Sequence, residues 1–145
     1  MAQILLNETT PNGGDLDANL NELYSKSAWS TTGIGYATGA GGAVTQATSK
    51  VTNITLNKVC GQITMNAASL ASGAQAAFGL FNSLIASTDV VVVSLASGYS
   101  ASTNYSVRVG STGSGNCTIV VKNESGGALA EAIILNFAVV KAVNV

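Results

Sequence analysis

The chain has 145 residues, the size of one ordinary domain, and a formal net charge of −1. Hydrophobic residues make up 47% of it, but charged residues make up only 9%, and there is no histidine. Six scattered basic residues cannot form the Lys/Arg footprint of a nucleic-acid-binding protein or the basic face of a membrane-surface helix. The lack of histidine excludes Ser-His-Asp triads and most transition-metal sites. Composition therefore argues against an ordinary enzyme, and we expect no catalytic residue, cofactor or metal.

Residues 1–30 differ from the rest of the chain and are predicted to form an N-terminal arm. They hold four of the seven acidic residues, and Pro11 lies in the turn-forming run TTPNGG. A short amphipathic helix is expected over 15–27, with an aspartate as its N-cap. The expected partner-binding residues are the apolar stripe of this helix and the tryptophan after it: Leu16, Leu20, Leu23, Tyr24 and Trp29. Because so short a helix is marginal in water, the stripe packs either on its own domain or on a partner.

Residues 31–145 are predicted to form one β domain. After a glycine-rich stretch at 31–42, apolar and polar residues alternate in short runs separated by turn residues. Strands are expected over 44–48, 51–58, 63–65, 78–80, 89–95, 105–109, 117–122 and 131–140. The four valines at 90–93 predict a strand covered on both faces. Short strands in this number, without long helices, indicate an antiparallel β-sandwich or jelly roll, with a barrel as the other possibility.

Individual motifs indicate structure rather than chemistry. Cys60 and Cys117 lack histidine partners and C-x-x-C spacing, so we expect two buried free thiols rather than a zinc site or a disulfide. The glycines of 33–42 match neither the P-loop nor the dinucleotide-binding fingerprint. Outside the arm the acidic residues are Asp89, Glu124 and Glu131, which we expect at solvated strand edges or turns. A surface so poor in charge is unusual for a free monomer, so we expect an oligomer or a larger assembly.

Several short stretches between residues 31 and 140 together resemble a family of small β-rich structural proteins of tailed bacteriophages and prophages. They are GYATGAGG at 35–42, VTQATSK at 44–50, LNK at 56–58, GQITM at 61–65, NSLI at 82–85, DVVVV at 89–93 and EAIILNFAV at 131–139. In the arm, ANLNELY at 18–24 is similar to a segment near the start of phage virion proteins. The resemblance implies a virion component, either a capsid decoration (cement) protein or a tail or fibre domain. It implies no catalytic motif.

One small domain with a single arm favours the capsid decoration protein. In this hypothesis, copies bind the outside of the expanded shell across the seams between coat subunits and stabilise it. The expected partners are the major capsid protein and further copies of the chain, as a dimer or trimer, with no nucleic-acid or membrane partner. Because the first residues lack a secretory signal, we expect synthesis in the host cytoplasm and a place on the capsid surface. The alternative is a tail or fibre tip that binds a host-surface receptor or glycan through the loops around Tyr36, Tyr99 and 110–116.

Overall fold

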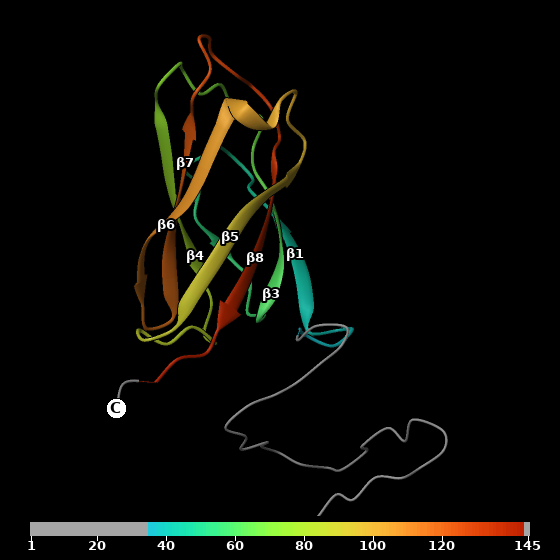
Figure 1. Ribbon diagram of the computed structural model, residues 1–145, viewed down its shortest axis with the longest axis vertical. Coiled ribbons are helices and arrows are strands. Elements are labelled where there is room, and N and C mark those ends of the chain that lie inside the picture. Colours follow the sequence, from blue (N-terminus) through green and yellow to red (C-terminus); the bar gives the residue numbers. More distant parts are fainter. Residues whose placement is uncertain (1–34, 144–145) are drawn as a thin grey trace, which may run out of the picture. The chain divides into compact units, whose positions relative to one another are not determined.

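The computed structural model describes residues 35–143, which form two four-stranded β-sheets packed face to face (Figure 1). Sheet A contains, in spatial order, β1 (Gly41–Thr45), β3 (Cys60–Thr64), β8 (Ile134–Val140) and β5 (Val90–Ser97). Sheet B contains β2 (Ile54–Thr55), β4 (Gln75–Phe81), β7 (Asn116–Asn123) and β6 (Tyr105–Gly113). A short 3-10 turn, η1 (Ser102–Asn104), joins β5 to β6. The expected mainly-β sandwich is confirmed, and it is not a barrel, because the described strands of one sheet do not pair with those of the other.

Both sheets are mixed, which corrects the expectation of purely antiparallel sheets. β1 pairs with β3 in parallel and β2 pairs with β4 in parallel, while the other four pairings are antiparallel. The cause is the path of the chain, because β1 to β4 alternate between the two sheets and each crossing reverses the direction (Figure 1). Strands two apart in sequence therefore run the same way and lie side by side in one sheet. The jelly-roll pattern of connections stays a prediction.

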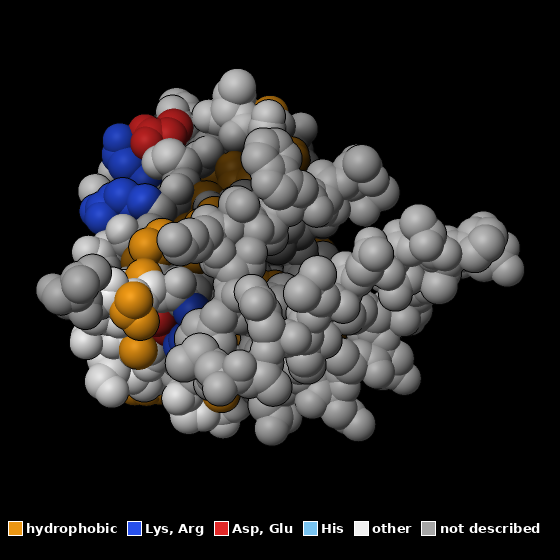
Figure 2. Space-filling model, turned by 60° about the horizontal axis from the view of Figure 1, so that its bottom comes forward, with side chains coloured by type: hydrophobic (Ala, Val, Ile, Leu, Met, Phe, Trp, Pro, Cys, Tyr) orange, Lys and Arg blue, Asp and Glu red, His pale blue; other side chains and the backbone are white. Residues whose placement is uncertain are grey.

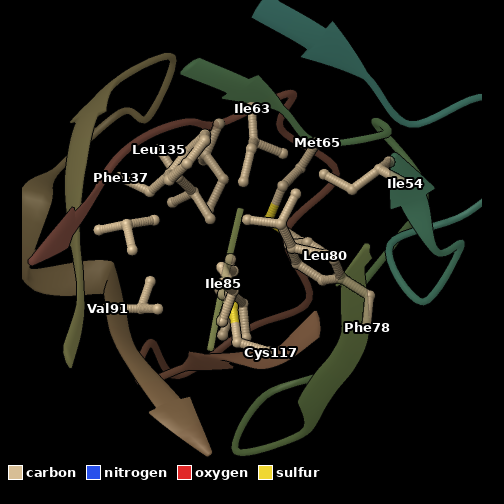
Figure 3. Close-up of a cluster of buried hydrophobic side chains, with 14 of the residues drawn as sticks. Ile54, Ile63, Met65, Phe78, Leu80, Ile85, Val91, Cys117, Leu135 and Phe137 are labelled. Atoms are coloured by element: carbon tan, nitrogen blue, oxygen red, sulfur yellow. The ribbon is translucent and has the colours of Figure 1, made fainter. Parts of the chain in front are cut away.

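The core lies between the sheets and consists of side chains that alternate inward along each strand. Figure 3 shows such side chains from both sheets pointing toward one another. Its labelled members are Ile54, Ile63, Met65, Phe78, Leu80, Ile85, Val91, Cys117, Leu135 and Phe137. The alternation expected over 105–109 and 117–122 is confirmed, since Tyr105, Ile119 and Val121 are buried. Within residues 35–143, no helix is long and apolar enough to cross a lipid bilayer.

The outer face of β5 is exposed, which corrects the expectation that the valines at 90–93 are covered on both faces; β5 also lies at the edge of sheet A. Val91 faces the core and is 7% exposed, whereas Val90 and Val92 are 55% and 52% exposed on the outer side of sheet A. An unbroken apolar run is typical of a strand that is covered on both faces, but it fits equally well a strand whose outer face is exposed in the single chain and binds another molecule. The run alone does not separate the two cases, because both place a valine on each face.

The boundaries of other strands also differ from the expectation, most clearly for the second and the last. The run expected over 51–58 forms only the two-residue β2, and the last strand begins at Ile134 rather than at 131. Cys60 and Cys117 are both free thiols, as expected. Burial raises the pKa of the Cys117 thiol to about 11, while Cys60 is only half-buried, which corrects the expectation of two buried thiols. The side chain of Cys60 lies on the outer side of sheet A, 3.5 Å from where a Cβ on Gly41 would stand.

Candidate functional site

Within residues 35–143, the strands of sheet A place no charged side chain on its outer side, and we call this side the uncharged face. None of the four strands of sheet A contains Asp, Glu, Lys or Arg. Side chains alternate across a sheet, so every second residue of each strand points outward. The uncharged face consists of Gly41, Ala43 and Thr45 from β1; Cys60, Gln62 and Thr64 from β3; Ile134, Asn136, Ala138 and Val140 from β8; and Val90, Val92 and Ser94 from β5.

One end of the uncharged face is apolar. Val90 lies opposite Val140, and in the next row Val92 lies opposite Ala138, which in turn lies opposite Cys60. The three valines are each more than half exposed, at 51% to 55%. Large side chains of this kind, gathered in adjacent rows of one sheet, are typical of a surface that binds another macromolecule. Figure 2 shows a strip of hydrophobic side chains on the left of the view, below a group of charged ones.

The other end of the uncharged face is polar but neutral. Ser94, Asn136 and Gln62 form one cross-strand row, in which the Gln62 Nε2 donates to the Asn136 Oδ1 at 3.1 Å. The row beyond it contains Thr64 and Ile134. Amides and hydroxyls of this kind lose little free energy on leaving water if the partner surface supplies hydrogen bonds. The whole uncharged face can therefore be buried without leaving an unpaired charge in the interface.

Three charged side chains lie on the outer side of sheet B instead. Lys122 of β7 and Glu124 form an ion pair at 2.6 Å, and the Ser106 hydroxyl donates to the other carboxylate oxygen at 2.7 Å. The hydrogen bonds from Lys122 and Ser106 hold the pKa of the Glu124 carboxyl below its ordinary value. Arg108 of β6 is exposed on the same side. Charge is thus segregated between the two sides of the sandwich, and such segregation distinguishes the two surfaces for any partner.

A buried carboxylate fastens the end of the chain beneath the apolar rows. The Asp89 side chain is 1% exposed, which corrects the expectation of a solvated turn residue. It accepts the Ala86 N–H at 2.8 Å and the Lys141 ammonium at 2.5 Å, and the Ala142 N–H lies 3.3 Å away. Lys141 also donates to the Leu84 carbonyl at 2.8 Å. These bonds tie the residues after β8 to the loop between β4 and β5, and they hold Val90 and Val140 in place at the two strand ends.

We predict that the protein loses stability as the pH falls below about 5. The hydrogen bond from Ala86 and the bond from Lys141 lower the pKa of Asp89 from its ordinary 3.8, and hydrogen bonds also lower the pKa of Glu124 and Glu131 from 4.5. A depressed pKa in the folded state stabilises the fold above the ordinary pKa, and this stability disappears as the pH falls through the depressed value. Urea unfolding at pH 7 and pH 3 measures the loss. Asp89→Asn should be less stable than the parent at pH 7 and show a smaller difference between the two pH values; an unchanged difference would contradict the role given to Asp89.

A second polar cluster lies inside the sandwich and includes a buried lysine. Lys50 is 3% exposed, and its ammonium donates to the carbonyls of Asn66 at 2.7 Å and Glu131 at 2.5 Å. Desolvation lowers the pKa of Lys50, although the nearby Glu131 carboxylate opposes this. One Glu131 oxygen accepts the Ser100 N–H at 2.6 Å, while the other, like the Tyr105 hydroxyl, is buried and has no hydrogen-bond partner among residues 35–143. Burial raises the pKa of Tyr105 to about 12.

This cluster is built to hold segments together. A nucleophilic or basic lysine needs a free lone pair and access to a substrate. Lys50 instead donates to two carbonyls and is almost completely buried. Gln46 extends the same network, because its Nε2 donates to the carbonyls of Lys50 at 3.1 Å and Thr52 at 2.9 Å. The cluster therefore joins the loop after β1 to the segments before β4 and β8.

The residues expected to bind a partner lie outside the described part of the chain. Leu16, Leu20, Leu23, Tyr24 and Trp29 all precede residue 35, so the arm remains a prediction.

The loops of the alternative hypothesis are described, and they do not form one site. The exposed Tyr36 donates from its hydroxyl to the Val139 carbonyl of β8. Tyr99 packs against the core, and the stretch 110–116 is the end of a hairpin that turns at Ser114 and Gly115, where Gly115 has a φ of +78°. Tyr99 and this hairpin lie at opposite ends of β6, a strand of nine residues. A strand of that length spans about 30 Å.

The chain matches no protein-family model, no curated protein and no solved structure. The uncharged face has only a weak signal in the sequence, because its four strands lack Asp, Glu, Lys and Arg but so do β2 and β4 of sheet B. That signal can be recognised only when the order of strands is known, because two charged strands, β6 and β7, lie between β5 and β8 in the chain.

Proposed function

We propose that this protein is a structural protein of a bacteriophage virion, of the capsid decoration (cement) kind, which binds the outside of the shell and stabilises it. The observation that carries the proposal is the uncharged face, an apolar and neutral side of a β-sandwich whose opposite side carries Arg108, Lys122 and Glu124. The resemblance of 31–140 to small phage structural proteins supports a place in a virion, and one small domain with a single arm favours the coat shell as the partner. Further copies of the chain are the second proposed partner.

The physical reason is the low free-energy cost of burying such a face. An ionised side chain that loses water without finding a partner costs several kcal/mol, whereas apolar side chains gain about 25 cal/mol for each Å² removed from water. The three exposed valines gain on burial, and the Gln62–Asn136 pair already satisfies part of its hydrogen bonding. The low net charge of −1 also limits repulsion between many copies arrayed on one shell.

The size of the face indicates that binding needs a second contact. Four strands about 4.8 Å apart, with about 20 Å of each strand exposed, cover roughly 400 Å². A stable interface commonly buries about 800 Å² on each partner. We propose that the arm, through Leu16, Leu20, Leu23, Tyr24 and Trp29, supplies the second contact to a neighbouring coat subunit or copy. Two linked contacts bind much more tightly than either alone, because the first raises the effective concentration of the second.

Co-sedimentation with expanded capsids that lack the protein tests the proposal. We expect saturation at a fixed number of copies per coat subunit, and the decorated capsids should survive a higher temperature because a bound ligand stabilises the state that it binds. The full chain with Leu20→Asp and Leu23→Asp should bind weakly while its far-UV circular dichroism remains that of the parent. If this double variant unfolds the domain, the stripe belongs to the core and the arm is not a docking segment.

The number of copies in each virion distinguishes a place on the capsid from a place in the tail. A decoration protein is present in hundreds of copies per particle and a tail tip in a handful, so densitometry of a stained virion gel distinguishes the two. No binding to capsids, together with a low copy number, would contradict the proposal and favour the tail or fibre tip.

A further inference from the structure

Three of the four edge strands of the sandwich carry a feature that hinders further strand pairing. An edge strand exposes unpaired backbone N–H and C=O groups, and proteins protect such edges with short strands, bulges or charges. β2 has only two residues, and the register of β5 shifts between Leu95 and Ser97. β6 has a register shift between Val109 and Ser111 and carries Arg108. β1, the remaining edge, has five residues, an unbroken register with β3, and neither charge nor proline.

The free edge of β1 presents the backbone groups of Gly41, Ala43 and Thr45. The Gln46 N–H donates to the Thr64 carbonyl at 2.9 Å, which places the backbone groups of even-numbered residues toward β3. Because these groups alternate along a strand, those of the odd-numbered residues face away from β3. No strand within residues 35–143 pairs with this edge, which borders sheet A in Figure 1.

A lysine lies close to β1 but leaves this edge uncharged. The Lys58 Cγ lies 3.0 Å from where a Cβ on Gly42 would stand, so its stem packs against the inward side of the strand. Its ammonium lies 3.5 Å from the Gly39 carbonyl, before β1 begins. The charge therefore stands at the end of the strand, and the stretch from Gly41 to Thr45 keeps only small, neutral side chains.

We propose that two copies of this chain pair through their β1 strands, antiparallel, about a twofold axis at Ala43. In this register Ala43 lies opposite Ala43 and Gly41 lies opposite Thr45, so the N–H and C=O groups of all three residues find partners on the other copy. The edge is its own complement, as a twofold interface requires. The small side chains bring no like charges together across the axis. A second copy can pair with every free N–H and C=O group of this edge, because it presents the same groups in the complementary order.

The pairing joins the two A sheets into one continuous sheet of eight strands. The twofold axis between antiparallel strands is perpendicular to the sheet, so both uncharged faces lie on the same side of the dimer. If the proposed function is right, the dimer presents two uncharged faces to one shell. Only this consequence depends on the proposed function. The pairing itself does not, because it concerns the protein without any capsid.

Sedimentation velocity of the 145-residue protein alone, together with amide hydrogen exchange, tests the pairing. We expect a dimer in which the Ala43 and Thr45 amides exchange slowly. Ala43→Pro removes the central N–H on the free edge and none of the hydrogen bonds to β3, and it should raise the dimer dissociation constant about thirtyfold. Ala43→Lys places two ammonium groups at the axis and should raise it at least about tenfold. Ala77→Lys makes the same change at an exposed position of β4 on the outer side of sheet B and should leave it unchanged.

Two results would overturn the proposal. One is a protein that stays monomeric up to about 1 mM, whether or not the two amides are protected, since protection in a monomer means that the same chain covers the edge. The other is a dimer that both Ala43 variants leave intact, which would place the interface elsewhere. Capsid binding that fails while the dimer persists would contradict the proposed function and leave the pairing standing.

Discussion

Replacing Lys50 by methionine is expected to lower the free energy of unfolding by about 3 kcal/mol, because two buried carbonyls each lose a hydrogen-bond donor. The Asn66 and Glu131 carbonyls accept from the ammonium at 2.7 and 2.5 Å. Methionine replaces the aliphatic stem with an unbranched side chain of similar shape that ends one atom earlier, so packing of the stem changes little and the polar loss dominates. An opposing effect exists, since desolvation of the ammonium lowers the pKa of Lys50 and this cost disappears with the charge. We expect the two carbonyls and the nearby Glu131 carboxylate, which are left without a cation, to outweigh that gain.

Urea unfolding at pH 7 measures the effect, and Lys122→Met is the matched control. Lys122 is on the outer side of sheet B and its ion pair with Glu124 is partly exposed, with side-chain exposures of 38% and 37%. Exposed pairs contribute about 0–1 kcal/mol, so the control should lose much less stability. A Lys50 variant as stable as the parent, or more stable, would show that burying the ammonium costs more than its two hydrogen bonds return.

The core of this fold could be predicted from the sequence because alternation of apolar and polar residues is a local property. The runs around Tyr105 and Ile119 show it clearly, and both residues are buried as expected. The parallel pairs could not be predicted, because they depend on which of two sheets each strand joins. The prediction that the valines at 90–93 are covered on both faces was wrong for a related reason. The outer face of β5 is exposed, and no residue near 90–93 distinguishes an exposed outer face from a covered one.

The buried polar residues could not be predicted from local sequence patterns, for a different reason. Lys50 lies between a serine and an exposed valine, a setting typical of a surface turn, and its acceptors are 16 and 81 residues away in the chain. Asp89 is likewise fixed by Lys141, 52 residues later. The uncharged face could be predicted only in part. The lack of charge in each strand is visible in the sequence, but which four strands lie together depends on the pairing.

A charge placed on the uncharged face is expected to weaken shell binding if the proposed function is right. Val92 is 52% exposed, stands opposite Ala138 and lies in the apolar rows. An ionised side chain buried there without a partner costs about 2 kcal/mol or more, so Val92→Lys and Val92→Glu should each raise the dissociation constant for capsids at least about tenfold. Both variants should bind weakly, because either charge loses its water when the uncharged face is buried against the shell. Co-sedimentation with expanded capsids measures both variants.

Two controls separate the loss of a contact from the loss of the fold. Val92→Thr keeps the branched shape, and because a hydroxyl costs much less to bury than a charge it should weaken binding less than either charged variant. Ala77→Lys adds the same charge as Val92→Lys to the exposed outer side of sheet B and should bind unchanged. If Val92→Glu weakens binding while Val92→Lys strengthens it, the partner surface is acidic and the argument from neutrality is wrong. If Ala77→Lys alone abolishes binding, the charged side of the sandwich faces the shell, and the uncharged face must serve another partner.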